Sequence, residues 1–247
     1  MAVMHFSHRK YVSDYMRIAV SRVLEHFDGK LDGKRVLDAP AGIGWVGEEL
    51  ARAGAEAVYG DINNEKSYFT HVDLEEPLQF DDCSFDAVVC CEGIEHVYSP
   101  WFLLSEFKRV LRPGGVIVIT TPNVQNLLSR LKFLFCGYLY QFEPFSKVPQ
   151  EFGDKGHISP VGYWQLDYYC QCLGLIVRQP TGGRLKRIIL FPFLMPFLGL
   201  GWLWSYLDYL KFGKRNQVVG YRILVNMFRL RVLLSRSLVF VAERPAT

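Results

Sequence analysis

Short segments rich in β-branched residues alternate with helical patterns along most of this chain, and this alternation limits the fold more than any other feature. The candidate strands are residues 35–38, 57–60, 85–90, 115–120, 175–179 and 238–243. Apolar positions at helical spacing lie near residues 9–27, 45–54, 100–111 and 160–173. Such alternation is typical of an α/β fold with a doubly wound, mostly parallel sheet.

The length and charge of the chain restrict its class further. Its 247 residues suit one domain with a large core, so we expect a single domain over residues 1–247. The net charge is only +3, which gives no broad basic surface, and we expect no nucleic-acid partner. Six cysteines without a CxxC pair and an N-terminal segment without an apolar run favour a reduced, cytoplasmic protein. The oligomeric state is not indicated.

Two segments interrupt the alternation. Residues 123–156 form a long, aromatic connection, which we expect to be a lid or acceptor-binding insertion because compact domains seldom carry such a segment without a use. Residues 184–236 form an apolar insertion before the last strand. It contains "IILFPFLMPFLGLGWLWSYL" at 188–207, a run without a charge. A helix of this length spans about 30 Å, the thickness of a bilayer's hydrocarbon core.

Other features of the insertion argue against a single membrane span. The chain has to return to the sheet, and Arg222, Arg229 and Arg231 would be costly at mid-bilayer. We expect instead a shallow helical hairpin in one leaflet at the cytoplasmic face of a membrane, with 188–207 making peripheral contact. Burial in a core subdomain or a dimer interface is the alternative. The residues predicted to interrupt a continuous helix are Pro192, Pro196, Gly199 and Gly201, and the flanking cations are Arg184, Lys186, Arg187, Lys211, Lys214 and Arg215.

A glycine-rich turn, "VLDAPAGIGWVG", follows the first candidate strand. Gly42, Gly44 and Gly47 match the GxGxxG pattern of a nucleotide-binding turn, although glycines here also serve tight packing. Asp38 ends the strand before them. A fixed carboxylate would repel a diphosphate but suits a ligand with an ammonium group, such as S-adenosylmethionine.

Four blocks of sequence in the same order resemble the class I S-adenosylmethionine-dependent methyltransferases. The resemblance covers residues 34–123 through "VLDAPAGIG", "VYGDIN", "DLEEPLQFDDCSFDAVVC" and "FKRVLRPGGVIVITTPN". It implies a Rossmann-like, mostly parallel seven-stranded sheet with the last strand antiparallel. Pro40 and Ala41 depart from the family's usual Gly-Cys, and Pro40 offers no N–H to a ligand.

The resemblance also assigns cofactor-binding residues. Asp38, Gly42 and Gly44 match the residues that hold the methionine end of S-adenosylmethionine. Asp61 matches the acid that holds the ribose hydroxyls. Asp73 matches the acid that reaches the adenine amino group, with Leu74 beside it. Asp61 and Asp73 could instead be turn caps, which is a routine role for aspartate.

The stretch "CCEGIEHV" at 90–97 lies at the carboxyl end of the candidate strand 85–90, where an acceptor is expected. As one helical turn, it places Glu92, Glu95 and His96 on one face. E-x-x-E-H resembles the metal motif of ubiquinone-pathway O-methyltransferases and of small-RNA 2′-O-methyltransferases, in which a further histidine joins the cluster; His157 matches it. Glu92, Glu95, His96 and His157 are thus candidate ligands of Mg, Mn, Fe or Zn. A metal-free base role for His96 and a purely structural role stay open.

These resemblances predict a methyltransferase that acts on a hydroxyl oxygen, with His96, Glu92 and His157 orienting and activating the acceptor. "TPNVQNLLSRLKFLFCG" and "HISPVGYWQL" resemble methyltransferases of surface-polysaccharide and lipid-linked glycan synthesis. A sugar or lipid-linked hydroxyl is therefore the first expected acceptor, and a small-molecule quinone precursor is the second. The alternatives are an RNA ribose methyltransferase and a non-catalytic, cofactor-binding partner in a membrane complex.

Overall fold

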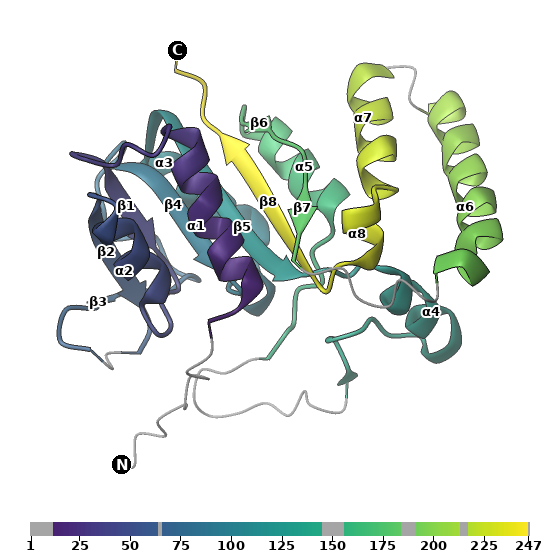
Figure 1. Ribbon diagram of the computed structural model, residues 1–247, viewed down its shortest axis with the longest axis horizontal. Coiled ribbons are helices and arrows are strands. Elements are labelled where there is room, and N and C mark those ends of the chain that lie inside the picture. The colour runs from purple at the N-terminus through teal and green to yellow at the C-terminus, as the bar shows by residue number, and fades with distance from the viewer. Residues whose placement is uncertain (1–11, 64–65, 145–155, 184–190, 213–216, 247) are drawn as a thin grey trace.

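The computed structural model describes residues 12–63, 66–144, 156–183, 191–212 and 217–246 (Figure 1). Within these residues, eight strands form one sheet in the order β3-β2-β1-β4-β5-β8-β6, with β7 also paired to β8. The strands are β1 (Arg35–Asp38), β2 (Glu56–Asp61), β3 (Thr70–His71), β4 (Phe85–Cys91), β5 (Leu111–Pro122), β6 (Ile176–Val177), β7 (Thr181–Gly182) and β8 (Ser237–Glu243).

The sheet has the expected topology. Strands β1 to β5 pair in parallel, and β8 is antiparallel to β5. The arrowhead of β5 points to the lower edge of the sheet in Figure 1, whereas that of β8 points to the upper edge. The predicted strand 175–179 is shorter than expected, and the two-residue β7 after it brings the sheet to one strand more than seven. Two-residue strands carry too little alternation to be recognised in a sequence.

Helices cover both faces of the sheet because successive strand residues point to opposite sides. On one face, α1 (Asp14–His26) and α2 (Trp45–Arg52) pack on residues such as Val36 and Val118. On the other face, α3 (Pro100–Val110) and α5 (Tyr163–Cys172) pack on residues such as Leu37 and Ile117. The candidate site lies at the polar edge of the sheet, where β1, β2 and β4 have their carboxyl ends.

The first insertion contains α4 (Leu127–Cys136). Its N-terminus is capped by Asn126, whose side chain accepts a hydrogen bond from the backbone N–H of Ser129. Its C-terminus is Gly137, which adopts the left-handed conformation that glycine tolerates best. Residues 145–155 of the predicted lid lie outside the described residues.

The second insertion contains α6 (Phe191–Phe212), α7 (Gln217–Met227) and α8 (Leu230–Leu234). Helices α6 and α7 lie side by side (Figure 1), with the Tyr209 and Tyr221 rings 6.1 Å apart. The predicted interruption was wrong, because α6 continues through Pro196, Gly199 and Gly201. The carbonyl that faces the missing Pro196 N–H is that of Pro192, an exposed residue in the first turn of α6.

Helix α6 has no buried residue, so the alternative of burial in this chain's own core was wrong. Within the part of the chain that the structure describes, no helix is long and apolar enough to cross a membrane. Residues 188–190 of the predicted stretch and five of its six flanking cations, all except Lys211, lie outside the described residues.

Arg222 anchors the insertion to the main domain. Its guanidinium donates a hydrogen bond to the fully buried Asp167 of α5 over 2.7 Å. Asp167 also accepts from the hydroxyl of Tyr163, which in turn accepts from the Asn226 side chain of α7. This network orients α7, so Arg222 faces the core of the protein.

Candidate functional site

In the glycine turn between β1 and α2, Gly42 borders open space, whereas Gly47 is packed against a neighbouring side chain. Gly42 has a φ of 53°, and a Cβ built on it would meet no atom within 4 Å. Gly44, with a φ of 79°, is the N-cap residue of α2. A Cβ on Gly47 would lie 2.4 Å from the Tyr59 ring. Gly47 therefore serves helix-to-strand packing, whereas Gly42 borders room for a ligand.

Asp38 is buried at the end of β1, beside this turn. One carboxylate oxygen accepts a hydrogen bond from the backbone N–H of Gly47 over 2.9 Å. The other oxygen, Oδ1, is buried and has no hydrogen-bond partner among the residues that the structure describes. Burial raises the pKa of Asp38 well above its usual value, the Gly47 N–H opposes this rise, and the charge of Asp61 adds to it. An unpartnered carboxylate oxygen at the end of the strand before this turn fits the ammonium group of S-adenosylmethionine.

Asp61 and Asp73 lie at the same edge of the sheet, and each accepts hydrogen bonds from the protein backbone. Asp61 accepts from the backbone N–H groups of Gly42 and Asn63, over 2.7 and 2.9 Å. It therefore shapes the glycine turn directly. Asp73 is half-buried beside Leu74 and accepts from the N–H of Glu75 over 2.9 Å. The capping role is present at both positions, and each carboxylate keeps lone pairs for a ligand.

The acceptor cluster forms where β4 ends. Ile94–His96 is one turn of 3-10 helix, and it carries the fully buried Glu95. The backbone N–H groups of Ile158 and Ser159 both donate to the carbonyl of Glu95, over 2.9 and 3.0 Å. These two bonds bring the segment after the first insertion back to the turn. As a result, the rings of His96 and His157 lie 4.9 Å apart, edge to face.

Three of the four candidate metal ligands come together. One ligand atom from each of Glu95, His96 and His157 lies within 4.8 Å of the others. Glu95 Oε2 accepts from the Thr121 hydroxyl over 3.1 Å, but within the described part of the chain the buried Oε1 has no hydrogen-bond partner. Burial and the neighbouring Glu92 raise the pKa of Glu95 well above its usual value. A carboxylate with one unpartnered oxygen, grouped with two imidazoles, fits a divalent cation such as Mn, Fe or Zn.

Glu92 stands apart from these three, and its expected place on the helical turn was wrong. The turn begins only at Ile94, and Glu92 has a left-handed backbone with a φ of 52°. Its N–H donates to the Thr120 carbonyl over 2.9 Å, which continues the sheet instead of a helix. Burial raises its pKa, and the positive charge of Arg236 opposes this rise. A left-handed glutamate is strained, as residues at functional sites often are.

Direct packing joins the glycine turn to the acceptor cluster. A Cβ on Gly93 would lie 2.4 Å from Cδ of Pro40, so only glycine fits beside this proline. The Ala39–Pro40 peptide is cis. Pro40 departs from the family's common pattern. Its contact with Gly93 packs the glycine turn directly against the segment that carries Glu92 and Glu95.

Three residues near the site were missed at the sequence level. Tyr15 of α1 is close enough to Glu92 for that charge to raise the pKa of the phenol, after burial as the main cause. Arg236 lies just before β8, and Gln141 connects it to His157. Gln141 Oε1 accepts from Arg236 over 2.8 Å, while its carbonyl accepts from His157 Nδ1 over 2.8 Å. These residues come from distant segments, and no local motif marks them.

Known proteins resemble this chain over the segment that carries the glycine turn and the end of β4. A family model described as "Methyltransferase domain" matches residues 37–119. A ubiquinone biosynthesis O-methyltransferase of Neisseria meningitidis serogroup C is 31% identical over 179 residues, which cover 64% of this chain and 71% of the relative. A demethylmenaquinone methyltransferase of Clavibacter sepedonicus is 36% identical over 124 residues, 44% of this chain and 49% of the relative.

Solved structures share the fold. A S-adenosylmethionine-dependent methyltransferase from Archaeoglobus fulgidus superposes with a TM-score of 0.55 at 21% identity, covering 92% of this chain and 93% of that one. The chain spans about half the length of the first curated relatives, 49% and 53%. The matched relatives, the sheet order and the acidic glycine turn together place this chain in the class I S-adenosylmethionine-dependent methyltransferases.

Proposed function

We propose that this chain transfers a methyl group from S-adenosylmethionine to a hydroxyl oxygen, with a divalent cation bound by Glu95, His96 and His157. The observation that carries the proposal is the carboxylate of Glu95, which has an oxygen within 4.8 Å of a ring nitrogen of His96 and one of His157. Glu95 is two residues from Gly93, which packs closely against Pro40 of the glycine turn. The buried Oε1 of Glu95 has no hydrogen-bond partner among the described residues. Neither buried core packing nor helix capping gives a reason for such an oxygen.

Each residue then has a physical role. Asp38 receives the cofactor's ammonium group, and the open face of Gly42 admits its methionine end. Asp61 and Asp73 take the ribose hydroxyls and the adenine amino group. S-adenosylmethionine supplies an activated methyl group, so the protein has to align the acceptor oxygen and help remove its proton. A cation held by Glu95, His96 and His157 would stabilise the negative charge on the oxygen and so help to remove its proton. Without a cation, His96 is the candidate base for that proton.

The acceptor that we propose is a hydroxyl on a lipid-linked molecule. The names of the relatives support a quinone precursor ahead of the sugar hydroxyl that the sequence pattern favoured. The test compares lipid and glycan extracts of cells with and without the gene. We expect one lipid-fraction compound to lack a single methyl group in the deletion strain, restored by the wild-type gene but not by a His96→Ala variant. Unchanged lipid and glycan fractions would contradict the proposal.

We further propose that α6 and the end of α4 contact a membrane at its cytoplasmic face. Phe197 and Trp204 of α6 are 70% and 73% exposed, and Phe135 of α4 is 79% exposed. So many exposed aromatic side chains on two neighbouring elements are unusual for a surface that meets only water. Trp202 and Tyr206 add stacked, amphipathic rings, which are typical of a bilayer interface.

The membrane proposal predicts a specific loss of vesicle binding. Phe197→Glu should lower co-sedimentation with vesicles of phosphatidylglycerol and phosphatidylcholine about tenfold, because a charge replaces an exposed aromatic side chain that would insert into the bilayer. Tyr168→Glu, at a 59% exposed position on α5, is the matched control and should bind as the wild type does. The wild type could fail to bind vesicles while Phe197→Glu converts a dimer to a monomer in gel filtration. That result would show that the exposed aromatic surface of α6 is a dimer interface.

A further inference from the structure

The turn after α4 carries a hydrogen-bonded link from the start of β8 to the acceptor cluster. Gln141 accepts at two atoms: its side-chain Oε1 accepts from the Arg236 guanidinium and its backbone carbonyl accepts from His157 Nδ1, each over 2.8 Å. A carbonyl oxygen can only accept, so Nδ1 of His157 carries a proton. In a neutral imidazole this leaves the lone pair on Nε2. The link therefore selects one of the two tautomers of His157.

The backbone of Gln141 is left-handed, with a φ of 71°. A glutamine seldom takes this conformation, and such strain persists only where the surrounding structure holds the residue in place. In an ordinary helical or extended conformation, the carbonyl of Gln141 would point in a different direction. The bond between the Gln141 side chain and Arg236 therefore helps to keep this carbonyl aimed at His157.

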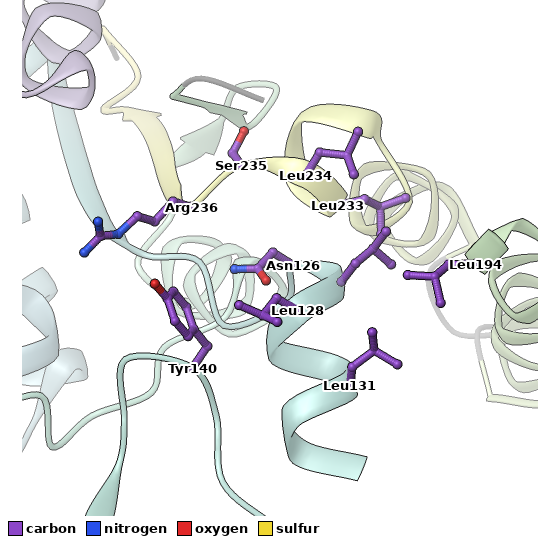
Figure 2. Close-up of a pocket in the computed structure, with 10 residues that line it drawn as sticks. Asn126, Leu128, Leu131, Tyr140, Leu194, Leu233, Leu234, Ser235 and Arg236 are labelled. Carbon is purple, nitrogen blue, oxygen red and sulfur yellow. The ribbon is translucent and has the colours of Figure 1, made fainter. Parts of the chain in front are cut away.

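The fold fixes both ends of this link. The backbone N–H of Tyr140 donates to the hydroxyl of the fully buried Ser129 in α4 over 3.1 Å. The backbone carbonyl of Arg236 accepts from the N–H of Asn123, just after β5, over 2.9 Å. Figure 2 shows the small pocket between α4, α6 and α8, where the Arg236 guanidinium points away from the leucines that line the pocket. The guanidinium is thus directed away from the apolar insertion.

Arg236 also lies close to the end of β4. Burial raises the pKa of Glu92, and the positive charge of Arg236 opposes this rise. Arg236 therefore acts on Glu92 through its charge and on His157 through Gln141. The side chain of Gln141 is the better place to cut the link, because a change at Arg236 would act on Glu92 as well.

We propose that Gln141 is a positioning residue for methyl transfer, which holds the proton of His157 on Nδ1 so that Nε2 is the nitrogen that meets a cation or the acceptor's proton. The inference rests on the proposed function. It gives the first insertion a role in the site, because Gln141 belongs to the expected acceptor-binding segment 123–156. An outer hydrogen bond of this kind to a ligating histidine is worth about 10- to 100-fold in metal affinity or activity.

The first test reads the tautomer directly. Long-range ¹H–¹⁵N spectra of protein labelled with ¹⁵N-histidine distinguish Nδ1–H from Nε2–H at about pH 9, above the usual histidine pKa of about 6.5. A His157→Gln sample assigns the signal. We expect Nδ1–H at His157 in the wild type and a larger share of Nε2–H in Gln141→Met, which has no side-chain oxygen to accept from Arg236. Nε2–H in the wild type would overturn the proposal whatever the variants do.

The second test measures methyl transfer to the compound identified from the deletion strain. Gln141→Met should lower kcat about 10- to 100-fold, with S-adenosylmethionine affinity within about twofold of the wild type. Gln141→Glu, whose carboxylate still accepts from Arg236, should restore both kcat and the Nδ1–H signal. Gln179→Met makes the same change at an exposed glutamine between β6 and β7 and should match the wild type.

The two tests separate this inference from the proposed function. An unchanged tautomer in Gln141→Met, or no rescue by Gln141→Glu, would overturn the positioning role. Normal methyl transfer by Gln141→Met would contradict only the role of Gln141, whereas a wild type that transfers no methyl group would contradict the proposed function.

Discussion

Replacement of Asp38 by asparagine is expected to weaken S-adenosylmethionine binding about 10- to 100-fold without lowering the stability of the protein. The loss follows from removing the charge-assisted hydrogen bond to the cofactor's ammonium group, a bond to a charged partner worth about 1.5–3 kcal/mol. Isothermal titration calorimetry measures the affinity. Asp81→Asn, at an exposed position before β4, is the matched control and should bind as the wild type does.

The free energy of unfolding should depend on pH in the direction opposite to that for an aspartate whose pKa is lowered on folding. Burial raises the pKa of Asp38 in the folded protein, so the folded state prefers the neutral carboxyl. Stability from this group is therefore lost as the pH rises from the unfolded value, about 3.9, through the folded pKa. Asp38→Asn removes this loss, and its melting temperature at neutral pH should equal or exceed that of the wild type. A clear fall would mean that Asp38 serves the fold and not the cofactor.

The same raised pKa predicts that cofactor binding releases protons. The ammonium group requires an ionised Asp38, which the free protein disfavours, so affinity should rise with pH below about pH 7.5, where the cofactor's own amine stays charged. Titrations in two buffers of different ionisation enthalpy measure the released protons. The wild type should release them and Asp38→Asn should not. An identical release by both would assign the effect to another group.

The fold could be predicted where local pattern and packing agree. Runs of β-branched residues correctly predicted the long central strands. Gly42 and Gly44, in the glycine turn after Asp38, adopt the left-handed conformations that only glycine takes easily. The continuity of α6 could not be predicted, because Pro196 is a helix breaker by local preference. Its cost is small where water reaches the freed carbonyl. The orientation of Arg222 likewise depends on Asp167, which is distant in the sequence.

The sequence named Glu92, Glu95, His96 and His157 as candidates, but it did not predict how they are arranged. Spacing alone placed Glu92 with Glu95 and His96, but the sheet extends through the N–H of Glu92 and the turn starts later. His157 reaches the cluster through two backbone bonds to the carbonyl of Glu95. Backbone hydrogen bonds of this kind leave no trace in side-chain identity, so only a family resemblance could indicate His157.

The acceptor cluster should give the largest effect of all. His96→Ala is expected to lower kcat about 10²- to 10⁴-fold, the usual contribution of a positioned base, while S-adenosylmethionine affinity stays within about twofold. The acceptor is the compound identified from the deletion strain, and transfer of a labelled methyl group is the measurement. His71→Ala, at an exposed histidine on β3, is the matched control and should retain full activity.

Metal removal separates the two roles that this cluster could have. If Glu95, His96 and His157 hold a cation, dialysis against a chelator should abolish methyl transfer by the wild type, and one of Mg, Mn, Fe or Zn should restore it. Glu95→Gln should then lose bound metal, measured by mass spectrometry of the protein's metal content, because a neutral amide is a far weaker ligand than a carboxylate. Full activity after chelation would instead make His96 a metal-free base, and the orphaned Glu95 oxygen would have to accept a proton or a hydrogen bond from the acceptor itself.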